Sequence, residues 1–134
     1  MTGPIRVEIA VKISPGELID KITILEIKAE RIADAAKRAN VLVELATLTD
    51  ARAAAIPADG EIDRLTAELK TVNEALWELE DDIRACDRDG DFGPRFVELA
   101  RAVYRTNDRR AELKRAINLR LGSRLIEEKS YKPY

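Results

Sequence analysis

The polar residues between positions 101 and 114 are the group best suited to binding chemistry. Arg101, Arg105 and Arg109 recur every four residues, which places them on one face if this stretch is helical. Each guanidinium group offers a planar fork of donors that fits phosphate or carboxylate oxygens. The sequence therefore contains a candidate anion-binding site made of Tyr104, Arg105, Asn107, Arg109 and Lys114.

The same arginines have a simpler use, which is pairing with acidic side chains of the same chain. Residues 59–91 carry 12 acidic and 4 basic side chains, whereas residues 92–134 carry 11 basic and 5 acidic. Opposite charges on adjoining segments favour intramolecular ion pairs. We favour this interpretation and keep the anion site as the alternative.

The acidic segment ends in a motif with the spacing of a calcium loop. Asp87, Asp89, Asp91 and Glu98 stand at the first, third, fifth and twelfth positions of an EF-hand loop. The sixth position of such a loop requires glycine for a sharp turn, yet Phe92 stands there. We therefore predict an ordinary interhelical turn and no metal site.

A second acidic set imitates the magnesium clusters of all-helical nucleotide pyrophosphatases. Its members are Glu26, Glu30, Glu74, Glu78, Asp81 and Asp82. A magnesium site needs these carboxylates to point inward, but Leu76, Leu79 and Ile83 occupy the inward positions. We expect a solvated acidic face, with Glu78 or Asp81 recruiting a metal as the alternative.

Several classes of protein are disfavoured by composition. The 134 residues include no histidine, the usual general base and transition-metal ligand near neutral pH. Cys86 is the only cysteine, so no intrachain disulfide can form, which suits a reducing cytoplasm. No apolar run approaches the length that spans a bilayer, and an isoelectric point near 5.4 with few aromatics disfavours nucleic acid. We predict a cytoplasmic protein without a cofactor and lean against an enzyme.

The residues above must be positioned mainly by helices. Ser14, Pro15 and Glu17 form a strong helix start, and Asp34 is placed to cap another helix, although residues 15–56 also permit one bent helix. From residue 62 to residue 86, apolar side chains alternate spacings of three and four, the seam of a coiled coil. Pro94 is placed to begin the last helix.

The expected fold is mainly α, as a single helical domain over residues 1–134 built on a long antiparallel helical hairpin or coiled coil. Its expected elements are a strand over 5–12, helices over 15–33, 35–56, 61–87 and 94–121, and a tail over 122–134. In this arrangement the acidic third helix lies along the basic fourth helix.

The predicted strand requires a second strand as its hydrogen-bonding partner. Ile5, Val7, Ile9 and Val11 alternate with polar or small residues, the period of a half-buried strand. A lone strand leaves its backbone groups unpaired, so it needs a partner. The partner is either the C-terminal tail around residues 125 and 126 or the same strand of a second copy, and we predict a homodimer.

Four blocks of sequence resemble a known family. Residues 14–28, 73–84, 104–114 and 127–131 read SPGELIDKITILEIK, NEALWELEDDIR, YRTNDRRAELK and EEKSY. These blocks are similar to a family of small uncharacterised bacterial helical proteins, a domain of unknown function. The resemblance covers most of the chain outside residues 46–60 and implies no established activity.

Taken together, the sequence predicts a non-enzymatic helical protein that acts in protein–protein interaction or as a scaffold, through its exposed charged helices. The alternative is a binding protein or metal-dependent enzyme for a small anionic, phosphorylated metabolite. In that case Arg105, Arg109 and Lys114 would hold the anion. Charged side chains that converge on an inward-facing pocket would favour this alternative.

Overall fold

The structure is a computed structural model that describes residues 3–134, and all regular secondary structure in that range is helical. Helix α1 spans Pro15–Arg31, α2 spans Ala35–Ala55, α3 spans Gly60–Arg88 and α4 spans Pro94–Arg120. The mainly helical fold predicted from the sequence is confirmed.

The starts of α1 and α2 follow from local hydrogen bonding. The Ser14 hydroxyl accepts a hydrogen bond from the Glu17 backbone N–H at 3.1 Å, and Pro15 occupies the first turn. The Asp34 carboxylate accepts from the Lys37 N–H at 2.9 Å. Because a new cap begins at Asp34, residues 15–56 form two helices and not one bent helix.

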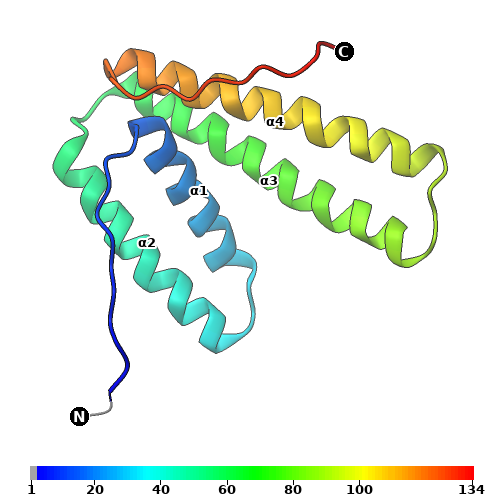
Figure 1. The fold of residues 1–134 in the computed structure, drawn as a ribbon, viewed down its shortest axis with the longest axis horizontal. Coiled ribbons are helices and arrows are strands. Elements are labelled where there is room, and N and C mark those ends of the chain that lie inside the picture. Colours follow the sequence, from blue (N-terminus) through cyan, green and yellow to red (C-terminus); the bar gives the residue numbers. More distant parts are fainter. Residues whose placement is uncertain (1–2) are drawn as a thin grey trace.

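The helices are arranged around the pair formed by α3 and α4. Figure 1 shows these two helices side by side and running in opposite directions, joined by the short loop 89–93. Helix α1 crosses one end of the pair, and α2 lies on the far side of α1 (Figure 1). The coiled-coil geometry of the seam stays a prediction.

The hydrophobic core lies where α1 meets the α3 and α4 pair. Ile19 of α1 is completely buried against residues of α3 and α4, which are Ile62, Leu65, Leu69, Leu113 and Ile117. Burying a side chain of this size contributes about 1.5–3 kcal/mol relative to exposure. The core therefore requires three helices.

Helix α2 takes little part in this core. None of its residues is buried, and it packs on α1 alone, apart from the Arg52 guanidinium, which reaches Asp63 and Thr66 of α3. Leu42 and Val43 leave apolar surface exposed on α2. No helix within residues 3–134 is both long and apolar enough to cross a membrane.

The predicted strand over residues 5–12 is not seen in the single chain. Residues 3–13 form no regular secondary structure, and Ile5, Val7, Ile9 and Val11 are 90%, 71%, 80% and 72% exposed. A strand forms only when a neighbouring strand accepts its hydrogen bonds, and the described part of one chain offers none. The C-terminal tail runs along α4 instead of pairing with this segment (Figure 1).

Candidate functional site

The Asp20 carboxylate of α1 is a buried charged group, only 1% exposed. Arg110 of α4 binds it at two points: Nε donates to Oδ1 at 2.9 Å and Nη2 donates to Oδ2 at 2.5 Å. Two-point pairing of this kind combines charge with fixed geometry. Asp20 and Arg110 thus form the centre of the candidate site.

Helix α3 completes this group. The Asn73 amide nitrogen donates to Asp20 Oδ1 at 3.0 Å and to the Thr23 hydroxyl at 2.9 Å, and that hydroxyl donates to the Asp20 backbone carbonyl at 2.8 Å. No buried side-chain nitrogen or oxygen of residues 3–134 lacks a partner. A fully satisfied polar group at a junction of three helices fixes how those helices meet.

The surroundings of Asp20 determine its protonation. Burial alone would raise the pKa of Asp20, but hydrogen bonds from Arg110 and Asn73, and the charges of Arg110 and Lys114, hold that pKa below its usual value. The carboxylate is therefore ionised near neutral pH. An ionised, fully paired carboxylate serves as an anchor and is poorly suited to donate a proton.

A second polar group lies beside the first. Lys114 Nζ is shared between Glu17 of α1 at 2.7 Å and Glu127 of the tail at 3.0 Å, and its side chain is mostly buried. Nearby, the Asn118 side chain accepts from the Gly16 backbone N–H at 2.7 Å. Helix α4 therefore holds both the start of α1 and the C-terminal tail.

A cleft of about 480 Å³ opens next to Asn73 and Arg110, between α1, α3 and α4. Its lining mixes apolar side chains, such as Ile24, Leu76 and Trp77, with polar ones, such as Asn107. Cation–π contact places the Arg31 guanidinium 6.0 Å from the Trp77 ring centre. Trp77 of α3 thus contacts Arg31 at the C-terminal end of α1.

The five residues of the predicted anion site are divided among three places. Tyr104 and Arg105 contact Tyr134 of the tail, at 4.9 Å between rings and 5.5 Å from guanidinium to ring centre. A second cleft lies between α4 and the tail, where Tyr104 and Tyr134 are part of its lining. Asn107 borders both this cleft and the cleft beside Arg110. Lys114 is engaged with Glu17 and Glu127 as described, so it does not converge with Arg105.

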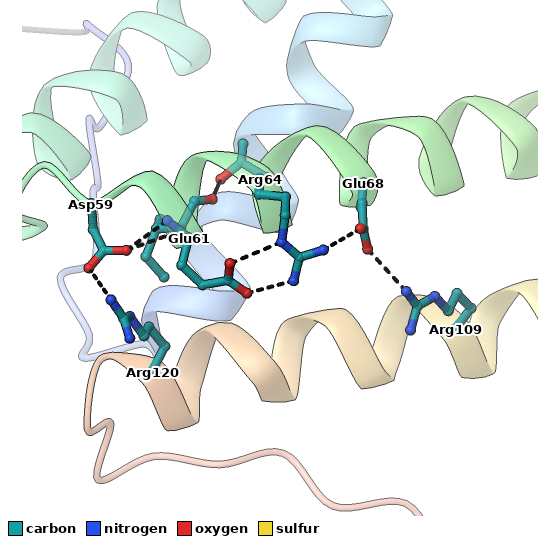
Figure 2. A network of polar contacts seen from close by, with 8 residues as sticks. Asp59, Glu61, Arg64, Glu68, Arg109 and Arg120 are labelled. Atoms are coloured by element: carbon teal, nitrogen blue, oxygen red, sulfur yellow. Dashed lines mark hydrogen bonds and ion pairs between the residues drawn. The ribbon is translucent and has the colours of Figure 1, made fainter.

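Arg109 lies on a different face, within a surface network along α3 (Figure 2). Its guanidinium pairs with Glu68 of α3 at 3.0 Å and with Glu112 at 3.2 Å. Glu68 is also bound by Arg64, which pairs with Glu61. Figure 2 shows this row ending at Asp59, which caps α3 and accepts from Arg120 at 2.9 Å.

The acidic α3 and basic α4 are therefore joined by few direct ion pairs. The structure gives two ion pairs between these helices: Arg109 with Glu68, and Arg120 with Asp59 at the start of α3. Other α4 cations bind α1 or the tail, as Arg115 does with Glu128. Acids of α3 likewise bind Arg31 of α1. Much of the opposite charge is thus used to attach α1 and the tail.

One basic region of α4 is not used in this way. A hollow of about 540 Å³ is bordered by Arg95, Arg101 and Arg105, with Glu98 as its one acid. The α4 cations that form ion pairs are Arg109, Arg110, Lys114, Arg115 and Arg120. The three arginines of the hollow are not among them.

The acidic loop after α3 has the geometry of a turn. Asp91 accepts from the Gly93 backbone N–H at 3.1 Å, and Asp89 pairs with Arg88 at 3.2 Å. Across residues 3–134 no three carboxylates or thiols come together as metal ligands. The Glu78 and Asp81 side chains are exposed, and Glu78 pairs with Arg31.

Sequence reasoning missed the pair of Asp20 and Arg110. The available signal was helical spacing. Asn73 lies four residues after Leu69 and three before Leu76, and Asp20 lies seven residues before Ile27, so each polar residue shares a face with buried apolar ones. A polar residue on the buried face of a helix must find a partner.

Comparison with known proteins gives a family and no function. No curated protein and no solved structure matches the chain. The model of a family of unknown function, DUF6165, matches residues 9–134, which include α1 to α4, Asp20, Asn73 and Arg110. The chain therefore belongs to the DUF6165 family.

Proposed function

We propose that this protein is a helical interaction protein that acts by binding polypeptide chains, first of all a second copy of itself, and not by catalysis. The observation that carries the proposal is the exposure of Ile5, Val7, Ile9 and Val11, which are all more than 70% exposed. Exposed aliphatic side chains that gather in one short segment form the kind of apolar patch that typically marks an interaction site. An extended backbone without partners presents free hydrogen-bonding groups beside them.

The rest of the molecule supports a role as a scaffold. The ion pair of Asp20 and Arg110 holds α1 against α4. Helix α2 has no buried residue and keeps apolar surface outside the core. A coiled-coil pairing of α3 and α4 would extend beyond α1 as a rigid arm. Cys86 is free and buried, which suits the reducing cytoplasm that we propose as its location.

Sedimentation equilibrium tests self-association directly. We expect the wild-type protein to populate a species heavier than the 15.0 kDa monomer as its concentration rises. Replacing Ile9 by Asp should shift the equilibrium to monomer, because the charge would be buried on pairing. Val97→Asp is the matched control, since Val97 is an exposed valine on α4, far along the chain from the segment. A wild-type mass of 15.0 kDa at every concentration would contradict the proposal.

A second candidate function is binding of a small anionic, phosphorylated molecule. The observation that favours it is the hollow of Arg95, Arg101 and Arg105 on α4, whose cations form no ion pair within the described residues. Pyrophosphate is a suitable probe. We expect it to raise the melting temperature of the wild type but not that of an Arg101→Ala/Arg105→Ala variant, with Arg109→Ala as control.

A further inference from the structure

We infer that the exposed N-terminal segment pairs with the same segment of a second copy, antiparallel, about a two-fold axis at Val7. This inference rests on the proposed self-association and adds which residues meet. The segment has the necessary properties. Its backbone runs extended (Figure 1) and makes no hydrogen bond within residues 3–134, and its large aliphatic side chains, from Ile5 to Ile13, all lie at odd-numbered positions.

Symmetry limits the registers to a few. In a symmetric antiparallel pair, residues equally distant from the axis lie directly opposite each other, and their side chains point to the same face. When the axis passes through a residue, each odd-numbered residue lies opposite another odd-numbered residue. The large aliphatic side chains of both copies then share one face. A register shifted by one residue would place apolar and polar side chains on the same face.

Charge then selects the central residue. With Val7 at the axis, Arg6 lies opposite Glu8 twice, and Ile5 lies opposite Ile9 twice. Cross-strand pairs of opposite charge stabilise a sheet, whereas like charges directly opposite destabilise it. An axis at Arg6 or at Glu8 would place the two copies of that charged residue directly opposite each other, as a like-charge pair.

Registers nearer to α1 are less favourable. An axis at Ile9 places Arg6 opposite Lys12, a like-charge pair. An axis at Ala10 places Glu8 opposite Lys12, but it also sets Arg6 against Ser14, whose hydroxyl already caps α1. The axis at Val7 leaves residues 12–14 outside the pairing as a link to the helix.

The same register accommodates Pro4, which has no backbone N–H to donate. Hydrogen-bonded and non-hydrogen-bonded pairs alternate along antiparallel strands. If the Val7 pair is hydrogen-bonded, Pro4 lies opposite Ala10 in a non-hydrogen-bonded pair, where its missing donor has no consequence. Arg6 and Glu8 then also form non-hydrogen-bonded pairs, whose side chains lie closer together.

Charge exchange tests the register. Arg6→Glu and Glu8→Arg should each raise the dimer dissociation constant about tenfold or more, because two attractive pairs become repulsive. The double variant should restore the wild-type constant to within about threefold, since it exchanges the partners of the same pairs. Lys12→Glu is the control, because Lys12 lies opposite no charge in this register, and it should leave the constant unchanged.

A cysteine cross-link gives a readout independent of charge. In a Cys86→Ala background, Val7→Cys should form an intermolecular disulfide on oxidation, because residues at the axis have Cα atoms about 5.5 Å apart. Ile5→Cys is the matched control, since the two copies of residue 5 would lie about 14 Å apart, four residues along the strand and one strand spacing across it.

The possible outcomes separate the two proposals. A wild-type dimer that is insensitive to Arg6→Glu, or that cross-links through Ile5→Cys and not Val7→Cys, overturns the register and leaves self-association intact. Rescue by Glu8→Arg/Lys12→Glu would instead indicate an axis at Ala10. A wild-type protein that stays monomeric would defeat both the register and the proposed function.

Discussion

Arg110 and Asp20 are joined by two hydrogen bonds although 90 positions separate them in the sequence. The carboxylate is 1% exposed, whereas the Arg110 side chain keeps 29% of its surface in contact with solvent. The pair connects α4 to α1, and Asn73 adds α3 to the same contact. Removing the arginine would therefore leave a buried, uncompensated negative charge.

Replacing Arg110 by Ala should lower the free energy of unfolding by about 3–5 kcal/mol, because one partner of a buried ion pair is lost. Arg109→Ala is the matched control: Arg109 forms exposed ion pairs, which are worth about 1 kcal/mol at most. Urea unfolding measures both. Equal losses for the two variants would mean that Asp20 is not held by Arg110.

Acid should weaken the fold partly through Asp20. Its pKa is lowered in the folded state, so it contributes stability that is present above the unfolded pKa of about 3.9 and is lost as the pH falls through the folded pKa. We expect the free energy of unfolding of the wild type to fall steeply below about pH 4. The Asp20→Asn variant, less stable at pH 7, should show a shallower fall. Parallel curves for the two proteins would refute this origin of the acid sensitivity.

Gly16→Ala should destabilise the protein by about 1–3 kcal/mol, because the added methyl group overpacks a closed contact. A Cβ at this position would collide with the Lys114 carbonyl oxygen and lie 2.8 Å from Asn118 Oδ1. Gly60→Ala is the control, since nothing lies within 4 Å of a Cβ there. Thermal unfolding of the two variants compares them. A melting temperature of Gly16→Ala equal to that of Gly60→Ala would show that α1 and α4 are less closely packed.

Calcium should not bind tightly to the loop between α3 and α4. Asp91 is hydrogen-bonded to the Gly93 N–H and Asp89 is paired with Arg88, while Phe92 stands where a calcium loop needs glycine. Calorimetric titration should give no saturable heat at micromolar calcium. Saturable binding that is lost on replacing Asp87 and Glu98 by Ala would overturn this expectation.

The sequence predicted the helical fold well and the N-terminal segment badly, for a physical reason. Helix caps and apolar seams are local, so Ser14 and Asp34 could be assigned from their neighbours alone, and the structure confirms both caps. A strand depends on a partner elsewhere. Alternation over residues 5–11 tells which side chains share a face, but it does not say whether any strand lies next to them.

Which arginine pairs with Asp20 could not be predicted from the sequence, for a related reason. Arg109 and Arg110 are adjacent in the sequence, yet one lies in an exposed network and the other binds a buried carboxylate. A helix turns by about 100° per residue, so a small error in its phase exchanges the two roles. Only the partner, Asp20, distinguishes them, and its position depends on how α1 packs.

The distance along the chain between α1 and α4 also has a consequence for the order of folding. Helices α3 and α4 are joined by the short loop 89–93, so bringing them together closes only a short loop and costs little chain entropy. Contacts such as Gly16 with Asn118 close a loop of about a hundred residues, at a greater cost in chain entropy. This favours a transition state in which α3 and α4 are already paired and α1 docks late. Substitutions at Asp20 or Gly16 would then act mainly by speeding unfolding, and those between α3 and α4 by slowing folding.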